Sequence, residues 1–103
     1  MDIIGELQKW YLSQCNDDWE HTYGIAISNL DNPGWHFEVD LTDTYLEDVP
    51  FETRSYGMGA EADISRNEWL ICERKDRKFR ASGGPEKLHE MISIFLAWAC
   101  ANA

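Results

Sequence analysis

The sequence predicts an α+β fold: an antiparallel four- to five-stranded meander, flanked by N- and C-terminal helices packed on one sheet face. Three observations lead to this prediction. Apolar residues recur at helical spacing near both ends of the chain, apolar and polar residues alternate in the middle, and turn-forming residues separate the alternating segments. Segregated helices around consecutive strands are typical of this class. With 103 residues, we expect a single domain over residues 1–103.

The first predicted element is a helix from about Asp2 to about Cys15. Ile3, Leu7 and Trp10 recur with the period of a helix and would form one apolar face. Asp2 stands where a carboxylate caps the helix or favours its dipole. A polar run after Cys15 then ends the element.

Two strands should follow as an antiparallel hairpin. The first covers Tyr23–Leu30, and the segment 31–34 combines Asp, Asn, Pro and Gly, which favour a turn. Residues 35–41 alternate strictly between apolar and polar types, which indicates a half-buried strand. This alternation directs one set toward the helices, namely Trp35, Phe37, Val39 and Leu41, and the other set toward solvent, namely His36, Glu38 and Asp40.

The second half of the chain predicts three shorter strands. The first is Phe51–Tyr56, and a loop rich in Gly, Ala and Asp follows over 57–65. Glu68–Arg74 is the next strand, with Leu70 and Cys72 on the face opposite to Trp69 and Ile71. A hairpin turn at 75–77 leads into a short final strand, Lys78–Ser82.

A second long helix should close the domain. Gly83-Gly84-Pro85-Glu86 is a helix-start signal, because Pro suits the first helical position and Glu the first turn. An apolar stripe that includes Leu88, Ile92 and Phe95 then predicts a helix from about Pro85 to about Ala101. Although glycine-rich, the segment 83–85 lacks the lysine and spacing of a phosphate-binding loop.

The chain is strongly acidic, with a formal net charge of −10. Residues 1–63 hold 14 acidic side chains against Lys9 and Arg54, a net of −12, whereas residues 64–103 hold 7 basic against 5 acidic, a net of +2. This charge balance argues against nucleic acid as a binding partner, because proteins bind its phosphates with Lys and Arg side chains. The one basic patch, at 74–80, is expected to be a charge-balancing, solvated hairpin. The acidity favours a basic protein partner or serves solubility.

The cysteines and the chain termini indicate a cytoplasmic protein. Cys15, Cys72 and Cys100 form neither a zinc motif nor a CxxC pair, and we expect buried, reduced thiols without a disulfide. No signal-peptide pattern opens the sequence, and the apolar stretch 91–103 is too short to span a bilayer. No motif for a cofactor is found.

Three weaker constellations leave an enzyme as the alternative function, either metal-dependent or hydrolytic. His36 and Glu38 share a strand face and could hold a metal with a third ligand. Cys15 and His21 could act as nucleophile and base, although a packed thiol is the commoner outcome. A carboxylate cluster comprises Asp17, Asp18 and Glu20; it suits acid–base chemistry, backbone capping or plain solvation. Within this cluster, Trp19 is expected to plug the core rather than to anchor a partner.

Several short segments together resemble one protein family. The most specific are Trp10-Tyr11-Leu12-Ser13-Gln14-Cys15 and Asp31-Asn32-Pro33-Gly34-Trp35. Further matches, in chain order, are Asp18-Trp19-Glu20-His21, Pro50-Phe51-Glu52, Trp69, Gly83-Gly84-Pro85 and Phe95-Leu96 followed by Trp98-Ala99. In this order they look like the immunity 53 family of bacterial polymorphic-toxin immunity proteins. The segment 56–66 matches least.

The resemblance implies a protein that binds a cognate toxin domain in the bacterial cytoplasm and blocks it, with no catalytic residue and no cofactor. Many such toxins are nucleases with basic grooves, which an acidic inhibitor can occupy. A homo-oligomeric module that uses an exposed sheet edge is a third hypothesis. We expect the toxin to bind the acidic hairpin face and the loop after it, comprising His36, Glu38, Asp40, Asp43, Glu47 and Asp48. Residues 36–48 contain five carboxylates and no Lys or Arg, so their field should not be neutralised locally.

Overall fold

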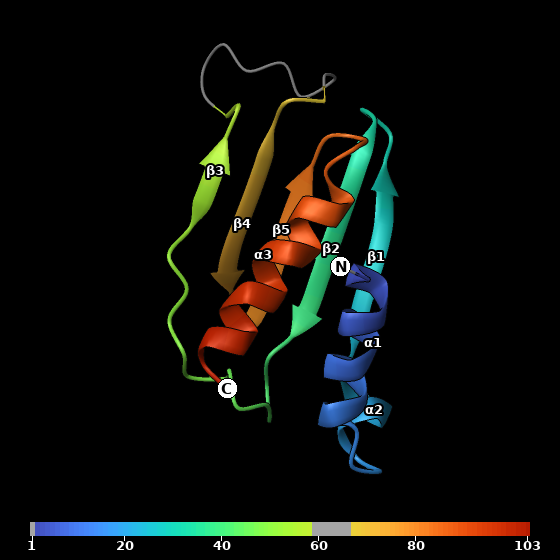
Figure 1. The fold of residues 1–103 in the computed structure, drawn as a ribbon, viewed down its shortest axis with the longest axis vertical. Helices are drawn as coiled ribbons and strands as arrows, with labels where there is room; N and C mark the ends of the chain where they lie inside the picture. The colour runs from blue at the N-terminus through green and yellow to red at the C-terminus, as the bar shows by residue number, and fades with distance from the viewer. Residues whose placement is uncertain (1, 59–66) are drawn as a thin grey trace.

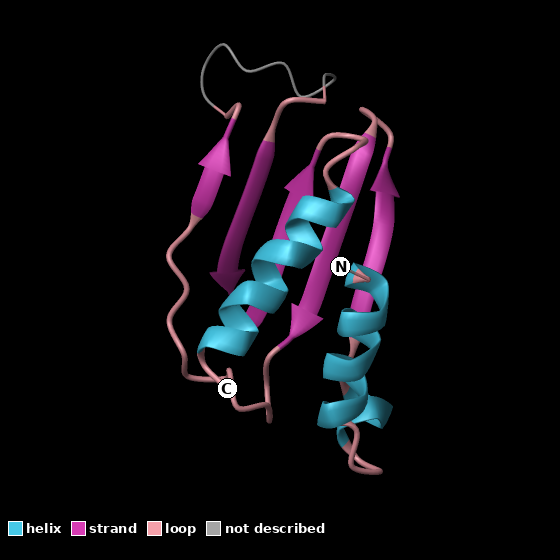
Figure 2. Cartoon of the chain, viewed as in Figure 1, coloured by secondary structure: helices cyan, strands magenta, loops and turns pink. Residues whose placement is uncertain are grey.

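A computed structural model describes residues 2–58 and 67–103 of the chain. It confirms the α+β class: one antiparallel sheet of five strands carries the N- and C-terminal helices on a single face (Figures 1 and 2). In chain order the elements are α1 (Ile3–Gln14), α2 (Trp19–Thr22), β1 (Ile25–Leu30), β2 (Gly34–Asp40), β3 (Arg54–Tyr56), β4 (Leu70–Lys75), β5 (Lys78–Gly83) and α3 (Leu88–Ala101).

The strand order is β1-β2-β5-β4-β3, so the sequential order of a meander was the wrong prediction. After β2 the chain crosses the end of the sheet to the far edge, and β3, β4 and β5 then return toward β2 (Figure 1). The crossing segment is itself packed, because Leu46 is fully buried and Phe51 packs against the core. This order places β2, β5 and β4, which contain the fully buried residues of the sheet, at its centre. Strands β1 and β3 form its edges.

The alternation of β2 is confirmed in the structure. Phe37, Val39 and Leu41 are 0% exposed and belong to the core. Trp35 is half-buried, and its indole Nε1 donates a hydrogen bond to the Pro85 carbonyl at 3.0 Å. The hairpin partner β1 begins at Ile25, two residues later than predicted.

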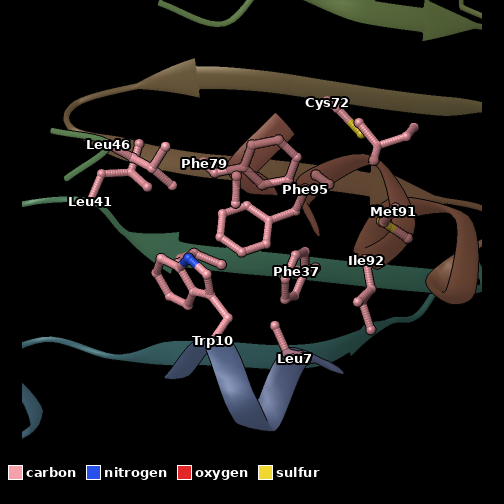
Figure 3. Close-up of a cluster of buried hydrophobic side chains, with 14 of the residues drawn as sticks. Leu7, Trp10, Phe37, Leu41, Leu46, Cys72, Phe79, Met91, Ile92 and Phe95 are labelled. Atoms are coloured by element: carbon pink, nitrogen blue, oxygen red, sulfur yellow. The ribbon is translucent and has the colours of Figure 1, made fainter. Parts of the chain in front are cut away.

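Aromatic rings connect both helices to the sheet (Figure 3). Phe95 of α3 is central: its ring centroid lies 4.9 Å from that of Trp10 of α1, 5.9 Å from that of Phe37 of β2 and 5.1 Å from that of Phe79 of β5. The pairs with Trp10 and Phe37 are edge-to-face, and that with Phe79 is tilted. Edge-to-face pairs stabilise by about 0.5–1.5 kcal/mol beyond the area they bury. Leu7 of α1 is also buried in this core cluster.

The N-terminal helix follows its prediction, and a short helix after it was missed. Asp2 caps α1 by accepting a hydrogen bond from the Gly5 amide at 2.9 Å. Helix α2 has only four residues, too few for a periodic pattern. It buries Trp19, which is 2% exposed and donates through Nε1 to the Thr42 carbonyl at 2.9 Å. Trp19 is thus a core plug, as predicted.

Helix α3 begins at Leu88 and not at Pro85. The segment before it is held by other contacts: the Glu86 amide donates to the Asn67 side chain at 2.8 Å, and Pro85 accepts the hydrogen bond from Trp35. A Cβ on Gly84 would lie 2.1 Å from the Asn67 carbonyl oxygen, so only glycine fits there. These contacts fix 84–87 as a turn, which the sequence pattern alone does not distinguish from a helix start.

Strands β4 and β5 form a two-residue hairpin at Asp76 and Arg77, both of which have positive φ (55° and 60°). Such a turn matches the twist of the strands it joins. Leu70 and Cys72 belong to the buried core, a choice of face that the sequence did not predict, and burial raises the pKa of the Cys72 thiol to about 12. Edge strand β3 is shorter than predicted. The predicted loop over 57–65 lies outside the described residues, except for its first two positions.

Two further findings bear on the expected setting of the protein. Cys15, Cys72 and Cys100 are all free thiols, but only Cys72 is buried; the expectation of buried thiols was wrong for the half-buried Cys15 and the exposed Cys100. Across residues 2–58 and 67–103, no helix has the length and apolar character needed to cross a bilayer.

Candidate functional site

The outward face of β2 lies directly beside β5. Cross-strand register pairs His36 with Ser82, Glu38 with Arg80, and Asp40 with Lys78. Because paired residues in an antiparallel sheet point to the same face, each carboxylate of β2 meets a cation of β5 on the face without helices. We call this surface the open face.

The carboxylates of the open face are neutralised by these cations, contrary to the expectation from the sequence. Glu38 Oε1 lies 2.9 Å from Arg80 Nε and 3.6 Å from Lys78 Nζ. Asp40 Oδ1 is 3.6 Å from the same Lys78 nitrogen, and Asp40 Oδ2 accepts from the Gly24 amide at 2.9 Å. The expectation was wrong because the partner of β2 is a basic strand that lies far from it in sequence.

Glu38 is the centre of this network. Burial opposes its ionisation, but the hydrogen bond from Arg80 and the charges of Lys78, Arg80 and His36 outweigh burial and lower the pKa of Glu38. His36 Nε2 lies 3.6 Å from Glu38 Oε2, and His36 Nδ1 lies 2.9 Å from the Ser82 hydroxyl. Both His36 and Glu38 are therefore held in fixed positions on a rigid strand.

A hollow of about 210 Å³ opens beside this network, at the start of the β1–β2 pair. Glu38, Asp40 and Lys78 line one side, and Gly24, Ile25 and Ala26 line the other. Gly24 contributes to the open space, since a Cβ built on it would meet no atom within 4 Å. The hollow thus presents two carboxylates beside small residues.

The other three predicted site residues lie apart from the open face, in the segment that crosses from β2 to β3. Glu47 Oε1 is 3.7 Å from Arg77 NH1, and its backbone carbonyl accepts from Arg74. The Asp43 amide donates to Glu47 Oε2 at 3.3 Å. Asp48 is exposed. Among the described residues, no hydrogen bond or ion pair joins this end group (Asp43, Glu47 and Asp48) to the open face.

Of the carboxylate cluster before β1, Glu20 caps the backbone, whereas Asp18 makes no side-chain cap hydrogen bond. Glu20 accepts hydrogen bonds from the Asn16 and Asp17 amides at 2.9 and 2.8 Å. Hydrogen bonds from backbone amides, including those of Asn16 and Asp17, lower the pKa of Glu20. Asn16 in turn accepts from the Trp19 amide at 2.8 Å. These contacts account for Glu20 as a structural residue.

The remaining catalytic constellations are not assembled in the described part of the chain. The Cys15 thiol donates to the Tyr11 carbonyl at 3.3 Å, and no hydrogen bond among the described residues joins it to His21. Across residues 2–58 and 67–103, no cluster of three or more His, Cys, Asp or Glu side chains surrounds a point where a metal ion would sit. His36 and Glu38 are neighbours without a third ligand of these types.

A second hollow was not predicted from the sequence. It is a groove of about 1010 Å³ between α1 and α3, and its lining includes Ile3, Trp10 and Leu96. Tyr45 reaches it from the crossing segment: its hydroxyl accepts from Trp10 Nε1 at 3.0 Å and donates to the Ala99 carbonyl at 3.1 Å. The apolar stripes of the two helices did not predict this groove, because residues that line it also pack the core.

Comparison with known protein families decides the class. The model of the family described as immunity protein 53 matches residues 4–100. The chain belongs to the immunity protein 53 family.

The match confirms the resemblance found in the sequence motifs and covers nearly the whole chain. No curated protein and no solved structure matched the chain. Membership of the immunity protein 53 family supports an immunity function in general and leaves the contact residues to be inferred from the geometry above.

Proposed function

We propose that the protein is an inhibitor and not an enzyme. It binds a cognate toxin domain in the bacterial cytoplasm and neutralises the toxin by occupying its surface. One observation carries this proposal: the immunity protein 53 match extends over residues 4–100, so the whole domain corresponds to the family. The fold supports it, because one five-stranded sheet with packed helices offers a preformed binding surface.

The toxin proposed here is a basic protein, and a nuclease is the class that fits best. A chain with a net charge of −10 attracts a positively charged partner over long range. Complementary charge speeds the encounter of the two proteins, which matters when a toxin must be caught before it acts. A groove that binds nucleic-acid phosphates has the required positive charge.

The proposed contact surface keeps the predicted residues, which are His36, Glu38, Asp40, Asp43, Glu47 and Asp48. The ion pairs hold Glu38 and Asp40 in place, so little side-chain freedom is lost on binding. Lys78 is 37% exposed and contacts both carboxylates, so an incoming arginine or lysine can take its place without leaving a charge unpaired. Asp48 is exposed in the crossing segment and adds a further carboxylate to the proposed contact residues.

Co-expression tests the function itself. The gene for this chain and the toxin domain encoded beside it are placed under separate promoters in one host. We expect growth to be rescued and a stable complex to elute on size exclusion. Toxicity that persists although both proteins are expressed, together with separate elution, would refute the proposal.

Charge reversal tests the surface. Glu38→Lys with Asp40→Lys should weaken binding to the toxin domain by about 2–5 kcal/mol if the pairs are buried in the complex. The control is Glu52→Lys with Glu86→Lys, two exposed positions that change the net charge equally. Glu38→Gln with Asp40→Asn serves as the milder variant, since it places no lysine against Arg80. Equal affinities for all these variants would remove the open face from the interface.

A further inference from the structure

The two edges of the sheet are built very differently. β3 has three residues, one of which is Arg54, and short charged edges are a common protection against strand pairing. β1 has six residues, Ile25–Leu30, with no charged residue, no proline and no positive φ. In a chain with 27% charged residues, this edge therefore lacks three of the usual protections, which are shortness, charge and proline.

The free main-chain groups of β1 can be located from the register. The Asp40 amide donates to the Gly24 carbonyl at 3.0 Å, and bonding alternates along an antiparallel pair. Ala26, Ser28 and Leu30 therefore bond to β2, while Ile25, Ile27 and Asn29 direct their N–H and C=O groups away from it. β1 has a single neighbouring strand in the described part of the chain.

The edge is also accessible and partly apolar. Residues 26–29 are all exposed, and the Ile27 side chain is 42% exposed on the helix-bearing face. Exposed main-chain groups next to an exposed β-branched residue are the features that an added strand uses.

We propose that β1 is a docking edge for an extended strand of the toxin domain, which adds to the sheet as a sixth strand. This inference rests on the proposed function and names the part of the protein that makes the main-chain contacts. The added strand would be apolar or small at its centre and basic toward its ends.

Charge selects this occupant over a second copy of the chain. Acidic residues flank β1 on both sides, with Asp17, Asp18 and Glu20 before it and Asp31 after it. An antiparallel second copy would place acidic ends against acidic ends, between chains that each carry a net charge of −10. A strand with lysine or arginine at its ends meets opposite charge at both positions.

The open face supports the same choice. A residue of the docked strand opposite Ala26 would point to the open face, and Ala26 is paired with Glu38. Little side-chain volume separates the edge of β1 from Glu38 and Asp40, because the residues of β1 and its approach that line the same hollow on this face are Gly24 and Ala26. A long basic side chain can thus cross β1 and reach the carboxylates, so the strand edge and the acidic hollow form one continuous surface.

The test uses the full chain and the toxin domain encoded beside its gene. Ile27→Pro should raise Kd about tenfold or more, because the ring blocks the edge while the lost N–H bonds to no strand in the fold. Ile27→Val retains the N–H and should stay within about twofold of wild type. Ile27→Lys should also weaken binding about tenfold, whereas Leu12→Lys, the same change at an exposed α1 residue, should not.

Amide hydrogen exchange on the wild-type complex gives a readout that needs no variant. The amides of Ile25, Ile27 and Asn29 should exchange about tenfold or more slowly when the toxin domain is bound. This measurement, with Ile27→Lys, decides the question if Ile27→Pro does not fold.

Different results separate this inference from the proposed function. If the wild type neither binds nor protects, the proposed function fails and this inference with it. If the wild type protects but the Ile27 variants bind equally well and the three amides keep their exchange rates, only the docking edge is refuted. Sedimentation that shows a wild-type dimer, dissolved by Ile27→Pro, would assign the edge to a second copy and overturn the proposal.

Discussion

Phe37 and Glu38 are neighbours on β2 whose side chains leave the strand on opposite faces. Phe37 is 0% exposed and its ring packs edge-to-face against those of Phe79 and Phe95. Glu38 bonds to Arg80 and lies beside Lys78 on the open face. One alternating segment therefore supplies both the centre of the core and the centre of the candidate site, and stability and binding can be tested separately there.

Truncation of Phe37 should strongly destabilise the fold. Phe37→Ala removes a fully buried ring and leaves a cavity, so the free energy of unfolding should fall by about 3–5 kcal/mol. Urea denaturation followed by tryptophan fluorescence measures it. Ile27→Ala, on the same sheet face but 42% exposed, is the control and should cost below about 1 kcal/mol. A similarly mild effect at Phe37 would contradict the packing described here.

Glu38 should make stability depend on acid pH. Its pKa is lower in the folded protein than in the unfolded chain, so its ion pairs stabilise fully above the unfolded pKa of about 4.3. That stability is lost as the pH falls through the lowered folded pKa. The difference in unfolding free energy between wild type and Glu38→Gln should thus be constant from neutral pH to about 5 and then shrink. A difference that does not change down to about pH 2 would show that Glu38 is not stabilised by its neighbours.

The secondary-structure elements differ in how well the sequence predicted them. The period of two in β2 predicted its core-facing set and its outward, half-buried set, since burial of one face imposes that pattern on the sequence itself. The position of β5 beside β2 could not be read in the same way, because it depends on where the crossing segment carries the chain. A hint was present: Lys78 and Arg80 alternate with the buried Phe79 and Ala81, and their charges complement Glu38 and Asp40.

The start of α3 was predicted wrongly for a related reason. Pro85 and Glu86 suit a helix start locally, but contacts with Trp35 and Asn67 hold them in a turn. Those contacts join segments far apart in sequence. Local patterns predicted the fold class and the outward residues of β2, whereas the charge balance of the site required knowledge of the strand neighbour.

Helices α1 and α3 are linked by a hydroxyl from outside both. Tyr45 accepts from Trp10 of α1 and donates to Ala99 of α3. Tyr45→Phe removes both hydrogen bonds and should lower the free energy of unfolding by about 0.5–1.5 kcal/mol. Thermal unfolding of this variant and of Tyr23→Phe, whose ring packs against Trp19, makes the comparison. Equal stability of wild type and Tyr45→Phe would mean that water replaces the hydroxyl without loss.

At the scale of the whole molecule, charge should govern how fast the toxin domain is captured. With a net charge of −10, the association rate constant should fall about tenfold or more when the ionic strength rises from about 0.05 to about 0.5 M. Stopped-flow fluorescence measures this rate, with the five tryptophans as the signal. A rate that is independent of salt would show that the acidity serves solubility alone.

The crossing of the chain from β2 to β3 also affects when protection can begin in the cell. The strand that completes the centre of the sheet, β5, is the last to leave the ribosome, and α3 with Phe95 follows it. Until then, Phe37 and Val39 have neither the neighbouring strand nor the helix that covers them. Pairing between such distant segments is slow to nucleate. A nascent chain is therefore unable to present a finished sheet, so under the proposed function protection begins only when synthesis has passed α3.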